Sequence, residues 1–369
     1  MSDKKDINFQ STERQKRILP EDSFGDWKWR EALAELMVPL IGSLYRNGIN
    51  IMIYGKSLVN ESPVSIMKAH RFARQADNNE LSESETFPMI QYISTLDLKD
   101  CEIDIGEIAV KCPFFNEIKD DQSKIPDYIN SELDSVINKK SNRPKDPMNI
   151  VLYGFGRIGR LVARMMTQTT GPGNYFILKA IVIRKGSEDD IFKRASLLTR
   201  DSVHGPFDGT VRVDEENSNL VINGNVVNVI YASAPEEVNY SDHGIKDPIV
   251  IDNTGVWRNE EGLSKHIKSG AKKVILTAPA KGDLKNVVHG INDDILDAGD
   301  SIISAASCTT NAIVPILKVI NDEYGIESGH IETVHAYTND QNLIDNFHKG
   351  DRRGRGAPLN MVITTTGAV

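Results

Sequence analysis

Two stretches of this 369-residue sequence combine residue types that could do chemistry, and the first is Ser304–Ala312 around Cys308. The apolar residues Ile302 and Ile303 predict the end of a strand, and the apolar residues after Cys308 recur at helical spacing. Cys308 is therefore expected at or just before the N-terminus of a helix. Free backbone N–H groups and the positive end of the helix dipole favour a thiolate there, and a thiolate is a nucleophile.

The alternative for a single cysteine is a buried core position, where the thiol packs as a small apolar group. Small and polar residues surround this sulfur, including Thr309 and Thr310, and His335 follows 27 positions later in a polar segment. These neighbours favour a reactive cysteine over a core cysteine.

The second stretch is the segment Gly154–Gly159, which follows the apolar strand Ile150–Tyr153 and opens an apolar-periodic helix. A G-x-G-x-x-G spacing between a strand and a helix is typical of dinucleotide binding. Gly154 permits the tight turn, Gly156 lets the backbone approach a pyrophosphate, and Gly159 lets helix and strand pack closely.

The next predicted strand, Ala180–Ile183, ends in Arg184 and Lys185. A site that prefers NAD usually has Asp or Glu at this point, where the carboxylate bonds the ribose hydroxyls. Two cations would instead attract a 2′-phosphate, unless Lys185 simply points to water. The cofactor is therefore expected to be NAD or NADP, with NADP bound at least comparably.

Ala306–Asn311 resembles the active-site signature of phosphorylating glyceraldehyde-3-phosphate dehydrogenases. Further segments resemble that family in the same order from Asn149 to the end of the sequence, whereas residues 1–147 have no counterpart in its common core. Phe155, Arg157 and Ile158 also match the family's version of the glycine motif.

The resemblance implies a role for each matching residue. The implied catalytic pair is Cys308 as nucleophile and His335 as general base. The expected cofactor residues are Gly154, Phe155, Gly156, Arg157, Ile158, Arg184, Lys185, Thr254, Gly255 and Thr277. The expected substrate and phosphate residues are Ser307, Thr309, Thr338, Thr366 and Gly367, with Thr309, Thr366 and Gly367 on inorganic phosphate and Thr338 on the substrate phosphate.

The implied reaction is the NAD(P)-dependent oxidation and phosphorylation of glyceraldehyde 3-phosphate to 1,3-bisphosphoglycerate, through a cysteine thioester, in glycolysis or gluconeogenesis. One alternative is an erythrose-4-phosphate dehydrogenase, because Tyr337–Gln341 resembles that enzyme more than the commonest glycolytic version. Another is a non-catalytic redox or regulatory relative in which Cys308 senses oxidants.

Three regions are expected along the chain. Residues 1–147 are predicted to be a mostly helical extension with a basic linker at 139–147, and 97–112 could be a strand or a helix. Within this extension, we interpret His70, Arg71 and Arg74 as a solvated helix face rather than a basic patch. Residues 148–307 are predicted to form a Rossmann-type α/β domain, a parallel sheet wound on both sides.

Residues 308–369 are expected to begin an α+β catalytic domain, with strands at 331–337 and 359–366. In the resembling family this domain continues for roughly another hundred residues. That part includes an arginine that clamps the substrate phosphate and a C-terminal helix. The sequence is therefore expected to end inside the catalytic domain, with a homo-oligomer, a homotetramer in the family, as the complete assembly.

Composition excludes several classes of protein. The net charge of −9 argues against a nucleic-acid partner. Three scattered cysteines, Cys101, Cys112 and Cys308, suit neither a disulfide framework nor a metal site, and none is expected. No apolar run approaches a membrane span and the first residues are charged, so a cytoplasmic protein without a membrane partner is expected.

Overall fold

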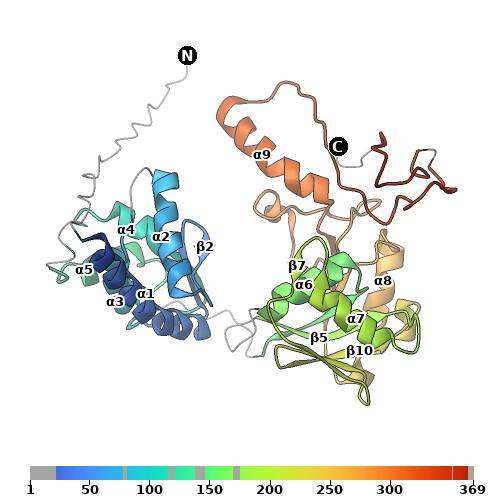
Figure 1. Ribbon diagram of the computed structural model, residues 1–369, viewed down its shortest axis with the longest axis horizontal. Helices are drawn as coiled ribbons and strands as arrows, with labels where there is room; N and C mark the ends of the chain where they lie inside the picture. Colours follow the sequence, from blue (N-terminus) through green and yellow to red (C-terminus); the bar gives the residue numbers. More distant parts are fainter. Residues whose placement is uncertain are drawn as a thin grey trace. The chain divides into compact units, whose positions relative to one another are not determined.

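The computed structural model describes residues 22–77, 81–114, 118, 121–137, 146–168, 175–350 and 352–364. The chain forms two compact units (Figure 1). The N-terminal unit comprises 1–147 with 169–175, and the C-terminal unit comprises 148–168 with 176–369. Most of the predicted linker lies outside the described residues.

The described part of the N-terminal unit combines helices with a small sheet. Its helices are α1 (Ser23–Arg46), α2 (Pro63–Asp77), α3 (Glu83–Ile93), α4 (Ile105–Lys111) and α5 (Ile125–Glu132). Its strands are β1 (Ile49–Ile53), β2 (Lys56–Ser57) and β3 (Cys101–Asp104). β1 lies in the middle, parallel to β3 and antiparallel to β2.

Local signals in the sequence set the helix starts of this unit. α2 begins at Pro63, where the missing N–H costs nothing. Ser82 caps α3 in a capping box with Glu85. The undecided stretch 97–112 contains both structures, first β3 and then α4.

β1 was not expected from the sequence, and it forms the middle of the sheet. Ile49, Ile51 and Ile53 are all buried and face the core of this unit. The strand is only five residues long, and its partner β3 is about fifty residues away in the sequence. Such a non-local pairing leaves no periodic signal long enough to identify it.

The interpretation of His70 as part of a solvated helix face is wrong. Its side chain is fully buried, with Nδ1 2.8 Å from the Ile66 carbonyl oxygen and Nε2 2.7 Å from Thr86 Oγ1. Burial lowers the pKa of His70, and nearby Glu83 only partly opposes this effect. The imidazole on α2 thus bonds to α3 as a neutral core group, because two hydrogen bonds make its burial tolerable.

Arg30 and Glu83 form a buried ion pair between α1 and α3. The guanidinium donates to both carboxylate oxygens, and both side chains are almost completely buried. We predict that Glu83→Ala lowers the free energy of unfolding of this unit by about 3 kcal/mol, since it leaves a buried cation without its partner.

Urea unfolding checks this prediction through the fluorescence of Trp27 and Trp29, in a Trp257→Phe background that removes the tryptophan of the other unit. Glu107→Ala is the matched control, because Glu107 pairs with Lys111 at the surface. It should change stability little. Equal effects of the two substitutions would contradict the prediction.

The C-terminal unit is built on an eight-stranded sheet in the order β13-β12-β11-β4-β5-β10-β9-β8. The strands are β4 (Met148–Tyr153), β5 (Phe176–Ile183), β8 (Val211–Asp214), β9 (Asn219–Ile222), β10 (Asn225–Tyr231), β11 (Ile249–Asp252), β12 (Lys273–Leu276) and β13 (Ile302–Ser304). From β10 to β13 all neighbours are parallel, and β9 and β8 add an antiparallel edge. In chain order the parallel strands read 3-2-1-4-5-6, the order of a dinucleotide-binding sheet.

Helices cover both faces of this sheet (Figure 1). The covering helices are α6 (Arg157–Gln168), α7 (Asp190–Thr199) and α8 (Glu260–Lys268). α9 (Cys308–Tyr324) follows β13 and has no buried residue. The unit also contains a two-stranded hairpin of β6 (Arg200–Asp201) and β7 (Gly205–Pro206) and the short 3-10 turns η1 (Pro235–Glu237), η2 (Tyr240–His243) and η3 (Asp293–Ile295). Ile150 and Leu152 of β4 pack with α6 and α7, whereas Val151 and Tyr153 pack with α8. The alternation confirms the predicted doubly wound α/β architecture.

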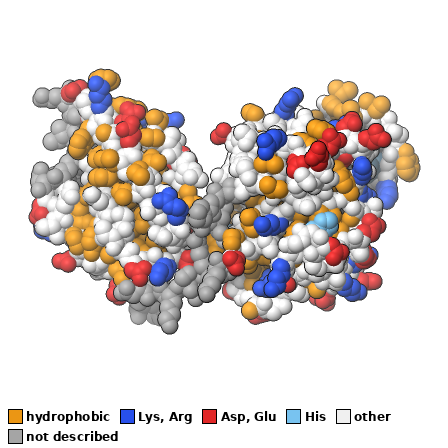
Figure 2. Space-filling view, turned by 90° about the horizontal axis from the view of Figure 1, so that it is seen from below, with side chains coloured by type: hydrophobic (Ala, Val, Ile, Leu, Met, Phe, Trp, Pro, Cys, Tyr) orange, Lys and Arg blue, Asp and Glu red, His pale blue; other side chains and the backbone are white. Residues whose placement is uncertain are grey.

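The chain after α9 has no strand among the residues described up to 364, so the strands expected at 331–337 and 359–366 are not observed there. A strand requires a hydrogen-bonded neighbour, and no described segment pairs with these residues. Their apolar side chains, including Val334 and Leu359, are exposed. Apolar side chains also gather on the face of the N-terminal unit shown in Figure 2. Trp29 and Leu36 of α1 are among the exposed apolar residues of this unit.

Two further properties follow from the described residues. None of the described helices combines the length and apolar character required to cross a membrane. Within the same ranges, no group of three or more His, Cys, Asp or Glu side chains is gathered closely enough to hold a metal ion.

Candidate active site

The glycine turn connects β4 to α6 at the centre of the sheet. Gly154 has φ +92°, and its N–H donates to the Val182 carbonyl oxygen at 2.8 Å. A Cβ on Gly159 would lie 2.3 Å from the Gly154 carbonyl oxygen, whereas a Cβ on Gly156 would meet nothing within 4 Å. Gly159 therefore permits close packing and Gly156 faces open space, as a pyrophosphate above the start of α6 requires.

A second turn, after β11, lies beside the first. A Cβ on Gly154 would come within 2.8 Å of Thr254 Cγ2, so the two turns lie too close for a side chain at Gly154. Gly255 has φ +63°, and Thr277 after β12 donates to the Asp252 carbonyl oxygen at 3.1 Å. β4 and β11 are where the strand order reverses, and this edge is where such sheets bind ligands.

Arg184 and Lys185 follow β5 and are both exposed. Lys185 Nζ lies 5.6 Å from the centre of the Tyr231 ring. The carboxylate of Asp190 is buried and accepts from the Gly186 N–H at 3.2 Å and Arg194 Nε at 3.3 Å. That acid is therefore turned inward and leaves the two cations at the surface.

Cys308 is the first residue of α9, as the sequence predicts. Ser307 is the N-cap, and its hydroxyl oxygen accepts the Thr310 N–H at 2.9 Å. Ala306 has φ +58°, a left-handed conformation that is rare for a residue with a side chain. This turn between β13 and α9 places the Cys308 sulfur at the positive end of the helix dipole.

Cys308 and His335 contact each other, with 3.5 Å between Sγ and Nε2. The hydrogen bond from His335 lowers the pKa of the Cys308 thiol, although partial burial opposes it. The same bond raises the pKa of His335, supported by the Ala336 carbonyl oxygen 2.5 Å from Nδ1. Nδ1–H donates to that carbonyl, so Nε2 faces the sulfur. Both shifts favour a thiolate–imidazolium pair over two neutral groups.

Arg157 is the first residue of α6, directly after the glycine turn. Its charge lowers the pKa of His335, by less than the hydrogen bond with Cys308 raises it. Among the other expected residues, Phe155 is buried in the core below the turn, whereas Ile158 is 46% exposed.

The expected phosphate residues are only partly described. Thr309 is half-buried beside Cys308 and forms a hydrogen bond that lowers the pKa of the thiol. Thr338 Oγ1 accepts the Asp340 N–H at 3.3 Å. Thr366 and Gly367 lie outside the described residues.

Sequence reasoning missed three polar residues of this site. Asn311 donates to the carbonyl oxygens of Ala305 and Ser307, both at 2.8 Å, and so fixes the turn before Cys308. Asp252 and His266 form a buried pair behind Thr254. Asn311 stands in the signature itself and could have been found there, whereas nothing local relates Asp252 to His266.

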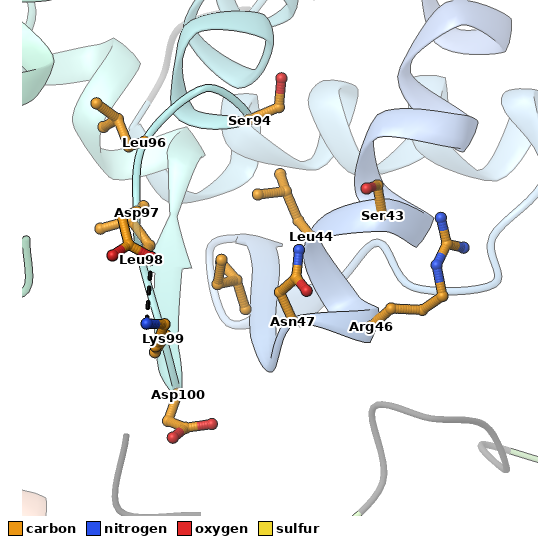
Figure 3. Close-up of a pocket in the computed structure, with 11 residues that line it drawn as sticks. Ser43, Leu44, Arg46, Asn47, Ser94, Leu96, Asp97, Leu98, Lys99 and Asp100 are labelled. Carbon is orange, nitrogen blue, oxygen red and sulfur yellow. Dashed lines mark ion pairs between the residues drawn. The ribbon is translucent and has the colours of Figure 1, made fainter. Parts of the chain in front are cut away.

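A separate cavity of about 300 Å³ lies in the N-terminal unit, between the end of α1 and the start of β3 (Figure 3). Its deeper walls are Leu44, Ile49 and Leu98, which are buried and apolar. Lys99 and Asp97 pair with each other at 3.4 Å on its exposed rim. No chemistry is assigned to this cavity.

Comparison with known proteins identifies both parts of the C-terminal unit. The family model "Glyceraldehyde 3-phosphate dehydrogenase, NAD binding domain" matches residues 148–260, and "Glyceraldehyde 3-phosphate dehydrogenase, C-terminal domain" matches 307–369. A "Glyceraldehyde-3-phosphate dehydrogenase-like protein" of Pseudomonas aeruginosa is 56% identical over 336 residues, 90% of this chain and 72% of that protein. Such a match includes most of residues 1–147.

Other relatives match a shorter part. A glyceraldehyde-3-phosphate dehydrogenase of Thermotoga maritima is 43% identical over 219 residues, 59% of this chain. Glyceraldehyde-3-phosphate dehydrogenase 1 of Bacillus subtilis is 40% identical over 222 residues, 60% of this chain. The chain spans 63% of the length of each of these two relatives.

Proposed function

This chain belongs to the glyceraldehyde-3-phosphate dehydrogenase family, and from that premise we propose that it oxidises a phosphorylated aldehyde and captures the product as an acyl phosphate. The proposed substrate is glyceraldehyde 3-phosphate, with inorganic phosphate, and the product is 1,3-bisphosphoglycerate. The observation that carries the proposal is the 3.5 Å contact between Cys308 Sγ and His335 Nε2 at the start of α9.

The first half-reaction uses both members of the pair. Cys308 thiolate attacks the aldehyde carbon, and the imidazolium of His335 gives its Nε2 proton to the carbonyl oxygen. Backbone N–H groups at the start of α9 can stabilise charge on that oxygen. His335 then takes the proton back. Gly154, Gly156 and the start of α6 would hold the pyrophosphate of a dinucleotide, whose nicotinamide would supply the hydride acceptor. Loss of hydride from the same carbon leaves a thioester on Cys308.

The second half-reaction restores the pair. Inorganic phosphate attacks the thioester carbon, the C–S bond breaks, and Cys308 leaves as a thiolate that His335 stabilises. Thr309 beside the sulfur is proposed to bind the incoming phosphate with Thr366 and Gly367, and Ser307 belongs to the same turn. Thr338 is proposed to hold the phosphate of the substrate.

Steady-state reduction of the cofactor tests this proposal with glyceraldehyde 3-phosphate and erythrose 4-phosphate, each with and without inorganic phosphate. The expected result is phosphate-dependent turnover with the higher kcat/KM for the triose. A higher value for the tetrose would favour the erythrose-4-phosphate alternative, which the segment Tyr337–Gln341 supports. No reduction of either cofactor with either aldehyde would favour a non-catalytic redox relative.

The family supports NAD, and we propose that NADP binds at least comparably. Arg184 and Lys185 stand exposed after β5, and Asp190 is buried and already paired. The carboxylate of Asp190 would therefore not repel a 2′-phosphate. We also propose that the protein is cytoplasmic. We propose that it forms a homo-oligomer, which in the family is a homotetramer.

Lys185→Asp is predicted to shift the ratio of NADP to NAD affinity about tenfold toward NAD, since it replaces an attraction to the 2′-phosphate by a repulsion. Titration of both cofactors by fluorescence measures the ratio. Lys193→Asp makes the same charge change on α7, where Lys193 pairs with Asp189, and should leave the ratio unchanged. A strong NAD preference in the parent protein would show that Lys185 does not face the ribose.

A further inference from the structure

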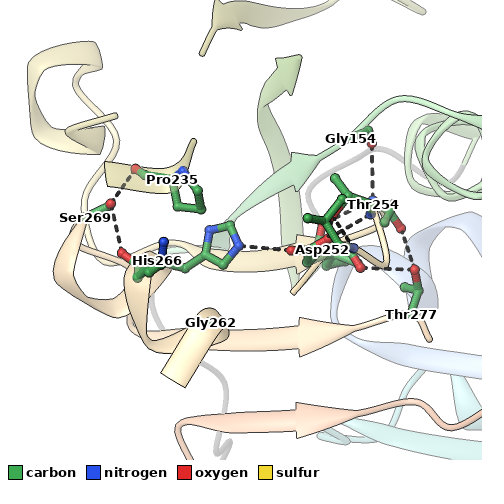
Figure 4. Close-up of polar contacts among 12 residues, drawn as sticks. Gly154, Pro235, Asp252, Thr254, Gly262, His266, Ser269 and Thr277 are labelled. Carbon is green, nitrogen blue, oxygen red and sulfur yellow. Dashed lines mark hydrogen bonds and ion pairs between the residues drawn. The ribbon is translucent and has the colours of Figure 1, made fainter. Parts of the chain in front are cut away.

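A fully buried polar pair lies directly behind the turn at Thr254 and Gly255 (Figure 4). Asp252 is the last residue of β11, and His266 lies on α8, which packs against one face of the sheet. Both side chains are completely buried, and His266 Nε2 lies 3.1 Å from Asp252 Oδ2. A buried carboxylate requires partners for both of its oxygens.

The other oxygen of Asp252 fixes the turn. Oδ1 accepts the Thr254 N–H at 2.7 Å and the Thr254 hydroxyl at 2.6 Å. Thr254 Oγ1 in turn accepts the Val256 N–H at 3.2 Å, across Gly255. One carboxylate therefore holds the backbone conformation of the turn from below, and it is itself held by the imidazole.

Among the residues that the structure describes, Asp252 is the one hydrogen-bond partner of the His266 side chain. Its Nδ1 is buried without a hydrogen-bond partner there. The ring is otherwise enclosed by aromatic edges, with its centre 4.7 Å from the ring centre of Tyr153 and 6.1 Å from that of Trp257. The hydrogen bond to Asp252 therefore requires the tautomer that carries its proton on Nε2.

The turn reaches the cofactor edge through short contacts. Asn253 Nδ2 lies 3.4 Å from the Gly154 carbonyl oxygen, and Asn253 Oδ1 accepts the Thr277 hydroxyl at 3.1 Å. The ends of β4, β11 and β12 are thereby connected. We expect a shift of Thr254 to affect Gly154, because the two turns lie so close that a Cβ on Gly154 would be 2.8 Å from Thr254 Cγ2.

We propose that His266 is a positioning residue for the dinucleotide: it holds Asp252 so that the carboxylate keeps the turn at Thr254 and Gly255, and with it the glycine turn, in the conformation that binds the cofactor. This inference rests on the proposed function, because it assumes that the dinucleotide binds at this edge. It assigns His266 no contact with the reacting atoms.

Two substitutions separate the hydrogen bond from the packing. His266→Phe keeps an aromatic ring between Tyr153 and Trp257 but cannot donate to Asp252. His266→Gln can donate through its amide but loses the ring. We expect His266→Phe to raise the Kd for NAD about tenfold and His266→Gln to stay within about threefold of the parent protein.

Ser269→Ala is the matched control. Ser269 directly follows α8, and its buried hydroxyl donates to the Pro235 carbonyl oxygen at 2.6 Å, away from the turn (Figure 4). This substitution should lower the melting temperature and leave the Kd unchanged. A purely structural role of His266 would give the same pattern, a lower melting temperature with unchanged affinity.

The Kd is measured by titrating NAD into the folded proteins without aldehyde or phosphate, with circular dichroism as the check on folding. Failure of aldehyde oxidation would therefore contradict the proposed function without affecting this result. An unchanged Kd in His266→Phe, or a larger loss in His266→Gln, would overturn the proposal. If His266→Phe does not fold, His266→Gln decides alone. A tenfold rise in its Kd for NAD would overturn the proposal, because it would show that the packing of the ring determines affinity. A retained Kd would support the hydrogen bond to Asp252.

Discussion

Cys308→Ser is expected to lower aldehyde-dependent cofactor reduction by about 10⁴-fold or more, because a serine hydroxyl is far less ionised than a thiol and cannot form the thioester. The side chain stands at the N-terminus of α9, so the substitution should leave the helix and its Ser307 cap intact. NAD affinity should stay within about twofold, since the glycine turn is unchanged. Initial rates and a cofactor titration measure the two effects.

Cys101→Ser is the matched control for that substitution. Cys101 is a partly exposed cysteine on β3 of the N-terminal unit. Its replacement should leave the rate unchanged. Residual activity of Cys308→Ser above a few per cent, or an equal loss in the control, would contradict Cys308 as the nucleophile.

His335→Asn is expected to lower the rate of oxidation by about 10³-fold, because both the base and the partner of the thiolate are lost. The same change should slow alkylation of Cys308 by iodoacetamide at neutral pH. The hydrogen bond from His335 lowers the pKa of the thiol, so its removal moves that pKa upward and reduces the thiolate fraction.

The direction of the pH dependence follows from the two shifts. The pKa of Cys308 is lowered and that of His335 is raised, so the fraction of thiolate–imidazolium pair near neutral pH is larger than for two isolated groups. In the parent protein, alkylation should therefore rise with pH through a midpoint below that of an ordinary thiol. In His335→Asn the midpoint should move to higher pH. Identical profiles for the two proteins would show that the 3.5 Å contact does not form in solution.

Much of this site could be predicted from the sequence because its signals are local. A helix start after a strand places Cys308, and the glycine spacing identifies the turn at Gly154. Both depend on backbone geometry over a few consecutive residues. The contact of Cys308 with His335 is non-local, and only the resemblance to a known family made it predictable.

The remaining features depend on contacts between distant segments. β1 is stabilised by pairing with β3, and His70 is buried because α3 covers it. Asp252 and His266 are 14 residues apart and meet only because α8 packs back onto the sheet. Neither charge nor periodicity distinguishes such residues from exposed polar ones, so their burial becomes visible only in the folded chain.

The central claim, a covalent thioester on Cys308, is tested most directly by mixing the protein with glyceraldehyde 3-phosphate and cofactor in the absence of phosphate. The expected result is a burst of about one reduced cofactor per Cys308, and a 3-phosphoglyceroyl thioester on the Cys308 peptide by mass spectrometry. Added inorganic phosphate should remove the adduct and start turnover. No adduct, an adduct on another residue, or full turnover without phosphate would contradict the claim.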